Sequence, residues 1–190
     1  MRIIAGSARG VTLKPPPDHS VRPTLDRVRE ACFSILGPAI PGARFLDLFA
    51  GTGANGLEAL SRGAAHADLV ESNRESRAII EENIRRTRLS DRAKVHALSV
   101  PEGLNRLAGT PPYDVVYADP PHAFTDFQSL LVAIERASLV TVDGLVVLEH
   151  ATRAEVPGSV GTLEKVRDAS YGKTTLSFYK PLNHGQDGPG

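Results

Sequence analysis

The sequence predicts an α/β fold built on one doubly wound, mostly parallel sheet. From residue 44 onward, apolar runs typical of buried strands alternate with helical stretches. A glycine-rich turn at 51–56 follows the first of these runs, and an acidic residue before two prolines at 119–121 ends a later one. Ligands of such sheets bind beyond the carboxyl ends of the strands, so the two ends can share one crevice.

The chain opens with a segment that has the pattern of two short strands, at residues 2–5 and 11–14. We expect a β-hairpin arm over residues 1–20, interrupted by the prolines that start at Pro15. The first thirty residues hold six Lys/Arg and three Asp/Glu, although the whole chain has a net charge of zero. This local excess favours contact with nucleic acid and is also compatible with a solvated surface.

A helix is expected next, from Thr24 as the N-cap to about Leu36. Asp26 suits the positive end of the helix dipole in the first turn, and Gly37-Pro38 ends the helix. The apolar residues at helical spacing, which predict the buried face, are Leu25, Val28, Ala31, Cys32 and Ile35.

The remaining chain divides into strands and helices that alternate. Strands are predicted near 44–48, 66–71, 93–97, 113–118 and 144–149, with helices near 55–62, 74–88, 101–107 and 124–138. Such units imply right-handed crossovers between parallel strands. Two final runs at 163–169 and 174–179, joined by a glycine turn, predict an antiparallel C-terminal ending to the sheet.

Composition fits one domain. With 190 residues, 41% hydrophobic and 23% charged, the chain suits a single domain over 1–182, made of the arm and a core at 21–182, with a disordered tail at 183–190. The lone Cys32 excludes an intramolecular disulfide and a cysteine zinc cluster, and the six histidines have no metal-ligand spacing. We expect a cytoplasmic monomer without a metal or a membrane segment.

The glycine turn matches G-x-G-x-x-G, a pattern that is weak by itself and stronger between a strand and a helix. Glu71 follows Gly51 by twenty residues, at the end of the next strand, where a carboxylate can accept hydrogen bonds from ribose hydroxyls. Glycine at Gly51 and Gly53 lets the backbone approach a ligand closely. The alternative is a tight turn with a solvated Glu71.

Asp47 helps to choose between the two cofactors that contain an adenosine ribose. It lies four residues before the turn, where a dinucleotide site usually has an apolar residue. A carboxylate there repels a pyrophosphate and suits the cationic amino-acid moiety of S-adenosylmethionine, which disfavours NAD. The alternative for Asp47 is a residue that caps the backbone.

The second motif, Asp119-Pro120-Pro121, is stiff because each proline fixes its own φ and restricts the residue before it. The carboxylate of Asp119 and the carbonyl of Pro120 are thus two fixed acceptors, which suit an exocyclic amine on a planar base. Positioning of this kind can supply about 7–11 kcal/mol without a metal or a covalent nucleophile. The alternative is a rigid turn with a capping aspartate.

The next residue, His122, is where a flat side chain would stack on a base taken out of its helix. Imidazole can stack, but it is smaller than a phenyl ring and changes charge near neutral pH. Phe124 could take over this role, and both residues also suit ordinary loop packing.

These motifs resemble the bacterial 16S ribosomal RNA guanine-N2 methyltransferases, a family of class I S-adenosylmethionine-dependent enzymes, over nearly the whole chain. The residues that carry the resemblance are Arg2-Ile3-Ile4-Ala5-Gly6, Arg9-Gly10, the run from Arg22 to Glu30, Asp47 to Gly53, Gly56 to Gly63, Glu71 and Asp119 to Pro121. The Arg-Pro-Thr and Glu-Ala-Leu-Ser-Arg-Gly segments are more specific than the glycine turn.

The resemblance implies a Rossmann-like methyltransferase that modifies a guanine amine in 16S ribosomal RNA, during small-subunit assembly, and releases S-adenosylhomocysteine. It implies that Asp119, Pro120 and Pro121 hold the amine. The residues that it assigns to the cofactor pocket are Arg22, Thr24, Asp47, Gly51, Gly53, Glu71 and Ser99. Two residues depart from the family: His122 replaces Phe or Tyr, and Ser99 replaces the Asp or Asn that commonly approaches the adenine.

Two other functions remain open at this point, and the length of the chain disfavours a third. A methyltransferase acting on DNA adenine N6 or on protein glutamine would use the same acceptor motif, although the basic arm favours nucleic acid. A noncatalytic RNA-binding protein could keep the same fold. An NAD-dependent oxidoreductase would need a substrate domain that 190 residues do not supply.

Overall fold

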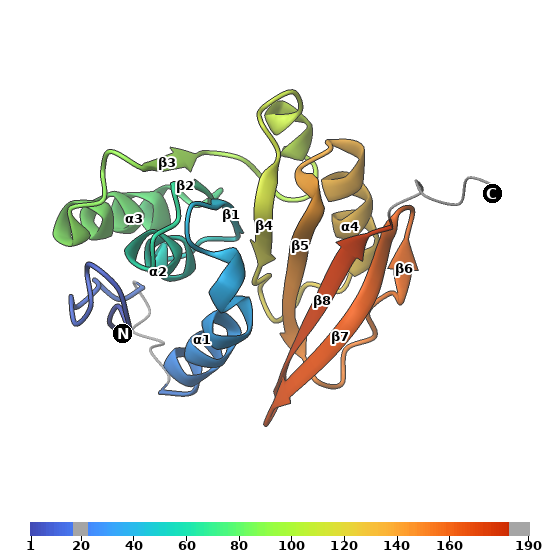
Figure 1. The fold of residues 1–190 in the computed structure, drawn as a ribbon, viewed down its shortest axis with the longest axis horizontal. Helices are drawn as coiled ribbons and strands as arrows, with labels where there is room; N and C mark the ends of the chain where they lie inside the picture. The colour runs from blue at the N-terminus through green and yellow to red at the C-terminus, as the bar shows by residue number, and fades with distance from the viewer. Residues whose placement is uncertain (17–22, 183–190) are drawn as a thin grey trace, which may run out of the picture.

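The computed structural model describes residues 1–16 and 23–182, and its eight strands form one sheet in the order β3-β2-β1-β4-β5-β8-β7-β6 (Figure 1). The strands are β1 Arg44–Leu48, β2 His66–Val70, β3 Ala93–His96, β4 Tyr113–Ala118, β5 Val140–Ala151, β6 Ser159–Val160, β7 Leu163–Tyr171 and β8 Thr174–Pro181. The helices are α1 Pro23–Leu36, α2 Ala54–Ser61, α3 Arg74–Thr87 and α4 Phe127–Arg136, with 3-10 turns η1 Gly37–Ala39 and η2 Leu104–Leu107.

The sheet confirms the doubly wound prediction. Strand β1 pairs in parallel with β2 on one side and with β4 on the other, so the direction of winding reverses between β1 and β4. Strands β3 and β5 extend the parallel part, while β8 is antiparallel to β5 and β7 to β8. The reversal point is where ligands of such folds bind.

Helices cover both faces of the sheet. One core joins α1, α2 and α3 to the sheet. In this core, the ring centroid of Phe45 lies 6.0 Å from that of Phe33 and 6.4 Å from that of Tyr117. The other core packs α4 and η2 against the opposite face, with Leu130 and Val116 fully buried. The two cores bury the apolar positions of β1 and β4 on both sides, as expected of central parallel strands.

The helix predicted at 101–107 is shorter than expected. Only the 3-10 turn η2 forms, because the preceding residues close tight turns instead: the Gly103 amide donates to the Ser99 carbonyl (2.8 Å), and the Leu104 amide donates to the Pro101 carbonyl (3.1 Å). The sequence pattern also misses β6, which has two residues and too short a run to recognise.

Helix α1 begins at Pro23, before the predicted N-cap. Thr24 therefore lies inside the first turn and is not the N-cap, a correction that agrees with the preference of proline for the first helical position. Arg22 and the tail 183–190 lie outside the described residues.

The N-terminal arm is the predicted hairpin in a minimal form. Residues 2–5 and 11–14 pair through one antiparallel bridge between Arg2 and Thr12, in which the Ile3 amide donates to the Val11 carbonyl (3.0 Å) and the Leu13 amide to the Met1 carbonyl (3.2 Å). The turn between them binds α2: the Ser7 amide donates to the Ser61 carbonyl (2.8 Å), and the Ala8 amide donates to the Ser61 hydroxyl (2.9 Å). Figure 1 shows the arm lying at the far side of the molecule from the β7–β8 hairpin.

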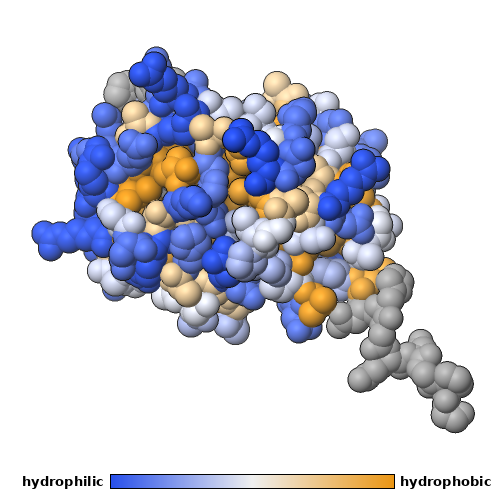
Figure 2. Space-filling model, turned by 90° about the horizontal axis from the view of Figure 1, so that it is seen from above, coloured by the Kyte–Doolittle hydropathy of each residue, from blue (hydrophilic) through white to orange (hydrophobic). Residues whose placement is uncertain are grey.

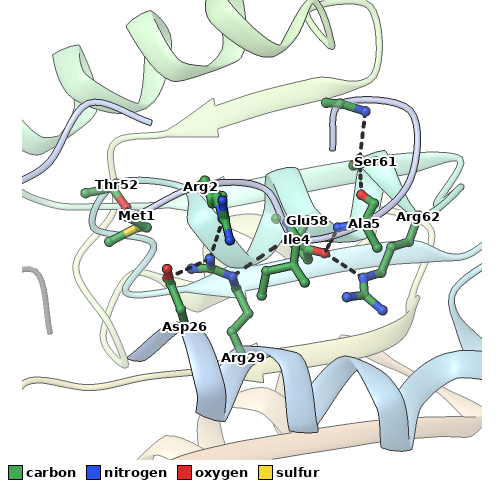
Figure 3. A network of polar contacts seen from close by, with 12 residues as sticks. Met1, Arg2, Ile4, Ala5, Asp26, Arg29, Thr52, Glu58, Ser61 and Arg62 are labelled. Atoms are coloured by element: carbon green, nitrogen blue, oxygen red, sulfur yellow. Dashed lines mark hydrogen bonds and ion pairs between the residues drawn. The ribbon is translucent and has the colours of Figure 1, made fainter. Parts of the chain in front are cut away.

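Glu58 of α2 is the main anchor of this arm (Figure 3). Its fully buried carboxylate accepts hydrogen bonds from the amides of Ile4 (2.8 Å) and Ala5 (3.1 Å). It also pairs with the guanidinium groups of Arg62 (2.6 Å) and Arg29 (3.9 Å). One buried acid thus ties together the arm, α1 and α2.

Two more contacts fix the path of the arm. Gly6 has φ +83 and packs so closely on α2 that a Cβ would overlap the Ser61 carbonyl, so only glycine fits there. Farther along, the Asn83 side chain of α3 accepts from the Lys14 amide (2.6 Å) and donates to the Thr52 carbonyl (2.9 Å). Asn83 thereby connects the arm to the glycine turn.

Hydrophilic side chains cover most of the face seen in Figure 2, and apolar atoms are confined to small separated areas. Val142, Val166 and Leu182 are large apolar residues that are exposed. Among the described residues, no helix is both long and apolar enough to cross a membrane.

We predict that Glu58→Ala lowers the free energy of unfolding by about 3–5 kcal/mol, because it removes one acid partner of the buried Arg29 and the only acceptor for the Ile4 and Ala5 amides among the described residues. Urea denaturation measures this loss. The matched control is Glu82→Ala on the exposed face of α3, where Glu82 pairs with Arg85 and Arg86 and its removal should have little effect. Equal losses in the two variants would contradict the anchoring role of Glu58.

Candidate active site

The turn after β1 has a strained backbone. Phe49 has φ +61, which is unusual for a bulky residue, and Gly51 and Gly53 have φ +56 and +78. A left-handed residue other than glycine costs about 1–3 kcal/mol and is concentrated at functional sites. Here the Ala50 amide donates to the Val70 carbonyl (2.9 Å), which holds the turn against β2.

Glycine is required within this turn for packing as well as for conformation. A Cβ on Gly53 would lie 3.0 Å from the Leu69 side chain and 3.2 Å from the Ile80 side chain. A Cβ on Gly51 would meet only the Phe49 carbonyl, at 3.9 Å. Gly53 therefore fits helix against sheet, while Gly51 leaves its side of the turn open for a ligand.

Asp47 is fully buried beneath this turn. Its Oδ2 accepts a hydrogen bond from the Gly56 amide (2.8 Å), whereas its Oδ1 has no partner among the described residues. Asp47 therefore caps the backbone through Oδ2, as the alternative interpretation expected, while Oδ1 can accept a hydrogen bond from a ligand. Burial raises the pKa of Asp47 to about 7, and the charge of Glu71 adds to this rise.

Glu71 follows β2 and already holds the glycine turn. One carboxylate oxygen accepts from the Gly51 amide (2.9 Å), and the other accepts from the Asn73 amide (2.8 Å). Arg77 donates to the carbonyls of Glu71 (3.1 Å) and Ser72 (2.5 Å), which fixes the loop. Glu71 is therefore not merely solvated, and each of its oxygens keeps a second lone pair for a hydroxyl donor.

Asp119, Pro120 and Pro121 lie directly beside the glycine turn. The register pairs Asp47 with Tyr117 and Leu48 with Ala118, and the Asp119 amide donates to the Leu48 carbonyl (3.4 Å). Pro120 is buried, and Asp119 keeps some exposed surface although its carboxyl group is enclosed by the protein. The two sequence motifs thus meet at the reversal point of the sheet, as predicted.

Acidic side chains dominate the electrostatics of the region where the two motifs meet. Burial raises the pKa of Asp119 well above its ordinary value, and the charges of Glu149 and Asp47 raise it further. Burial also raises the pKa of Glu149, while the Tyr117 hydroxyl, which donates to its carboxylate, opposes this rise. Three carboxyl groups therefore share a region where water stabilises their charges poorly.

Arg29 of α1 is the buried cation beside these acids, with 4% of its surface exposed. Its guanidinium donates to the Arg2 carbonyl (2.7 Å) and to Asp26 (2.9 Å), and its charge lowers the pKa of both Asp47 and Glu149. Sequence reasoning missed Arg29, Tyr117 and Glu149. Their positions in the sequence could have indicated two of them. Arg29 lies in the Arg22 to Glu30 segment that carries the family resemblance, and Glu149 follows a buried strand run, as Asp119 does.

The two candidates for base stacking differ in their surroundings. His122 is exposed on the loop after Pro121. Phe124 is partly buried and packs edge-on against Phe49 and Phe127, with ring centroids 5.6 and 5.5 Å away. Phe124 therefore has a packing role, and the stacking role of either residue stays a prediction.

Ser99 lies after β3, at the same edge of the sheet, and is exposed. Its carbonyl accepts from the Gly103 amide (2.8 Å). Thr24 is the second residue of α1, and its side chain, like Arg22, lies outside what the structure describes, so the predicted cover over the cofactor remains a prediction for both.

Two surface hollows, of about 340 and 380 Å³, lie away from this site. One is lined by residues such as Pro41, Asp114 and Asp143, and the other by residues such as Pro101 and Arg136. The candidate site is therefore defined by its polar groups and strand ends. Within the described part of the chain, no cluster of three His, Cys, Asp or Glu side chains could hold a metal ion.

Known proteins resemble this chain along its length. A family described as "Conserved hypothetical protein 95" matches residues 1–180. The Bacillus subtilis (strain 168) protein named "Putative rRNA methyltransferase YlbH" is 35% identical over 181 residues, which cover 95% of this chain and 98% of that protein. The Escherichia coli (strain K12) protein "Ribosomal RNA small subunit methyltransferase D" is 32% identical over 188 residues, covering 98% and 92% respectively.

A solved structure gives the same answer for the fold. The hypothetical protein TTHA0928 of Thermus thermophilus superimposes with a TM-score of 0.81 at 38% identity, covering 95% of this chain and 99% of that one. Sequence and fold are therefore shared over nearly the whole of each protein.

We predict that Asp47→Asn stabilises the protein at pH 8 and not at pH 4. The folded-state pKa of about 7 lies above the ordinary 3.8, so the unmutated protein loses stability as pH rises between these values, and the variant does not. The difference in unfolding free energy should grow by up to about 4 kcal/mol over this range. Urea denaturation of both proteins at several pH values measures it. A difference independent of pH would show that folding does not raise the pKa of Asp47.

Proposed function

The chain belongs to the ribosomal RNA small subunit methyltransferase D family and is an RNA methyltransferase, and we propose that it methylates the exocyclic N2 amine of a guanine in 16S ribosomal RNA. The proposed methyl donor is S-adenosylmethionine, and the proposed partner is 16S ribosomal RNA or the assembling small subunit. The observation that carries the proposal is the position of Asp119-Pro120-Pro121 beside the glycine turn, joined through the Leu48 carbonyl.

The residues at the turn fit S-adenosylmethionine in charge and in hydrogen bonding. The unpartnered Oδ1 of Asp47 suits the ammonium of its amino-acid moiety, and Glu71 suits the ribose hydroxyls. Gly51 provides backbone without a side chain, and Ser99 would lie toward the adenine. The bound donor supplies an electrophilic methyl group on a sulfonium sulfur.

The acceptor side holds the substrate amine. The Asp119 carboxylate and the Pro120 carbonyl can each accept one N–H of the amine, which turns its nitrogen lone pair away from the base and toward the methyl group. Because Pro120 and Pro121 fix the backbone, the amine is positioned without further ordering of the loop. His122 or Phe124 would support the ring of the base.

The arm supplies the proposed RNA contact. Arg9 and Lys14 are both exposed, and the arm that carries them is held rigidly by Glu58, Ser61 and Asn83. A positive surface of this kind binds phosphate groups through charge and releases counterions.

We predict that Asp119→Ala lowers methyl transfer by about 100-fold or more, because the amine loses one of its two fixed acceptors. The assay is transfer of labelled methyl from S-adenosylmethionine to small-subunit particles from cells that lack this protein, followed by nucleoside analysis. The expected product is N2-methylguanosine. Asp143→Ala, an exposed acid on β5 at the far end of the sheet, is the control that keeps activity.

Each other outcome has a definite meaning. N6-methyladenosine in place of N2-methylguanosine would assign a different base, and cofactor binding without transfer to any RNA would favour a noncatalytic RNA-binding role. Calorimetry of Asp119→Ala should show unchanged affinity for S-adenosylmethionine. An equal loss of cofactor affinity would place Asp119 on the cofactor instead of the amine.

We predict that the double charge reversal Arg9→Glu and Lys14→Glu weakens RNA binding and flattens its salt dependence. The slope of log affinity against log salt concentration should fall by about one for each lost phosphate contact. Arg136→Glu with Lys173→Glu reverses two exposed charges away from the arm and is the control. An unchanged slope in the arm variant would exclude the arm as the phosphate contact.

A further inference from the structure

Glu149 is a buried acid that the proposed amine-holding geometry does not yet use. It lies near the end of β5, with 9% of its surface exposed, and its carboxylate accepts a hydrogen bond from the Tyr117 hydroxyl of β4. A carboxyl group in this position has a cost in stability, because burial disfavours its charged form. A role in the site would account for its presence.

The register of the sheet brings Glu149 next to Asp119. Strands β4 and β5 are parallel and adjacent, and Ala118 pairs with Leu148. Asp119 is the first residue after β4, and Glu149, the next residue of β5, lies at the same level of the sheet. The Tyr117 hydroxyl donates to Glu149, and the charge of Asp119 acts on the same tyrosine, so both acids lie near Tyr117.

Residues from several elements surround Asp119 and Glu149 and set their electrostatic environment. On β8, the residue opposite Glu149 is the apolar Leu176. The titratable and charged groups that act on the pair are Tyr117 of β4, Asp47 of β1, Arg29 and Cys32 of α1, and His122 of the loop after Pro121. The acids outnumber the buried cation, so the charge of either carboxyl group raises the pKa of the other.

We propose that Glu149, held by Tyr117, is a positioning residue that acts through Asp119 and enables Asp119 to accept the proton that the substrate amine loses. The inference rests on the proposed function and adds a role in proton transfer to the role of Asp119 in holding the amine.

The proton balance is simple. When the amine nitrogen forms a bond to the methyl carbon of the proposed donor, the methyl–sulfur bond breaks and its electron pair goes to sulfur. One N–H bond of the amine must also break, with its electron pair staying on nitrogen. The proton forms an O–H bond with the Asp119 carboxylate, which later releases it to water. Burial and the charge of Glu149 raise the pKa of Asp119, so this carboxylate is a better base than an isolated aspartate.

The test is Glu149→Gln, which keeps an acceptor for the Tyr117 hydroxyl and removes the charge. The rising limb of the pH–rate profile of methyl transfer should move to lower pH by about one pH unit or more, because Asp119 loses the neighbouring charge that raises its pKa. The rate on the plateau should fall by about tenfold, because a weaker base accepts the proton less readily. Glu135→Gln, on α4 across the sheet, changes a glutamate that accepts from the Thr162 amide and is the matched control.

A second measurement does not depend on activity. Carbon-13 NMR titration of labelled carboxyl groups in the protein without ligand should show a lower pKa for Asp119 in Glu149→Gln. Coupling is mutual, so the pKa of Glu149 should fall in Asp119→Asn, which also covers the case in which Glu149→Gln does not fold.

The outcomes separate the two proposals. An unmoved pH profile in Glu149→Gln with unmoved carboxyl titrations would overturn the role of Glu149, even if N2-methylguanosine is formed. A lower plateau without a shift of the profile would mean that Glu149 is only structural. If no RNA is methylated, the proposed function fails, while the NMR titrations still decide whether Asp119 and Glu149 act as a pair.

Discussion

The parallel pairing of β1 with β4 is the constraint on which the site depends. These strands are distant in sequence, and the chain forms β2 and β3 on one side of β1 before it returns to form β4 on the other. Their carboxyl ends therefore meet at the reversal point, which places a glycine turn beside a rigid acceptor motif. Helices on both faces bury the two strands and keep their register fixed.

The same pairing concentrates negative charge. Asp47, Asp119 and Glu149 each have a raised pKa, with burial as the largest cause, and Arg29 is the buried cation that partly compensates. Groups whose ionised forms are disfavoured in the folded protein lower its stability as pH rises, so this arrangement trades stability for function. A cationic donor bound at Asp47 would relieve part of the repulsion.

The arm gives a structural meaning to the most specific sequence segment. In Glu-Ala-Leu-Ser-Arg-Gly, Glu58 and Ser61 bind the backbone of residues 4–8, and Arg62 neutralises Glu58. This segment carried the resemblance to a family, but its sequence alone did not indicate its structural role. Its role depends on a partner segment more than fifty residues away, which local sequence cannot identify.

The sequence by itself determined the alternation of strands and helices, the glycine turn, and the placing of Asp47, Glu71 and Asp119 at strand ends, because periodicity and turn chemistry are local properties. Only the tertiary structure decided that the backbone of the arm binds α2, that one oxygen of Asp47 caps Gly56, and that Glu149 lies at the level of Asp119 in the sheet. These features depend on which strands become neighbours and on which hydrogen-bonding groups meet partners far away in the sequence. The packed fold sets the free energy of those contacts.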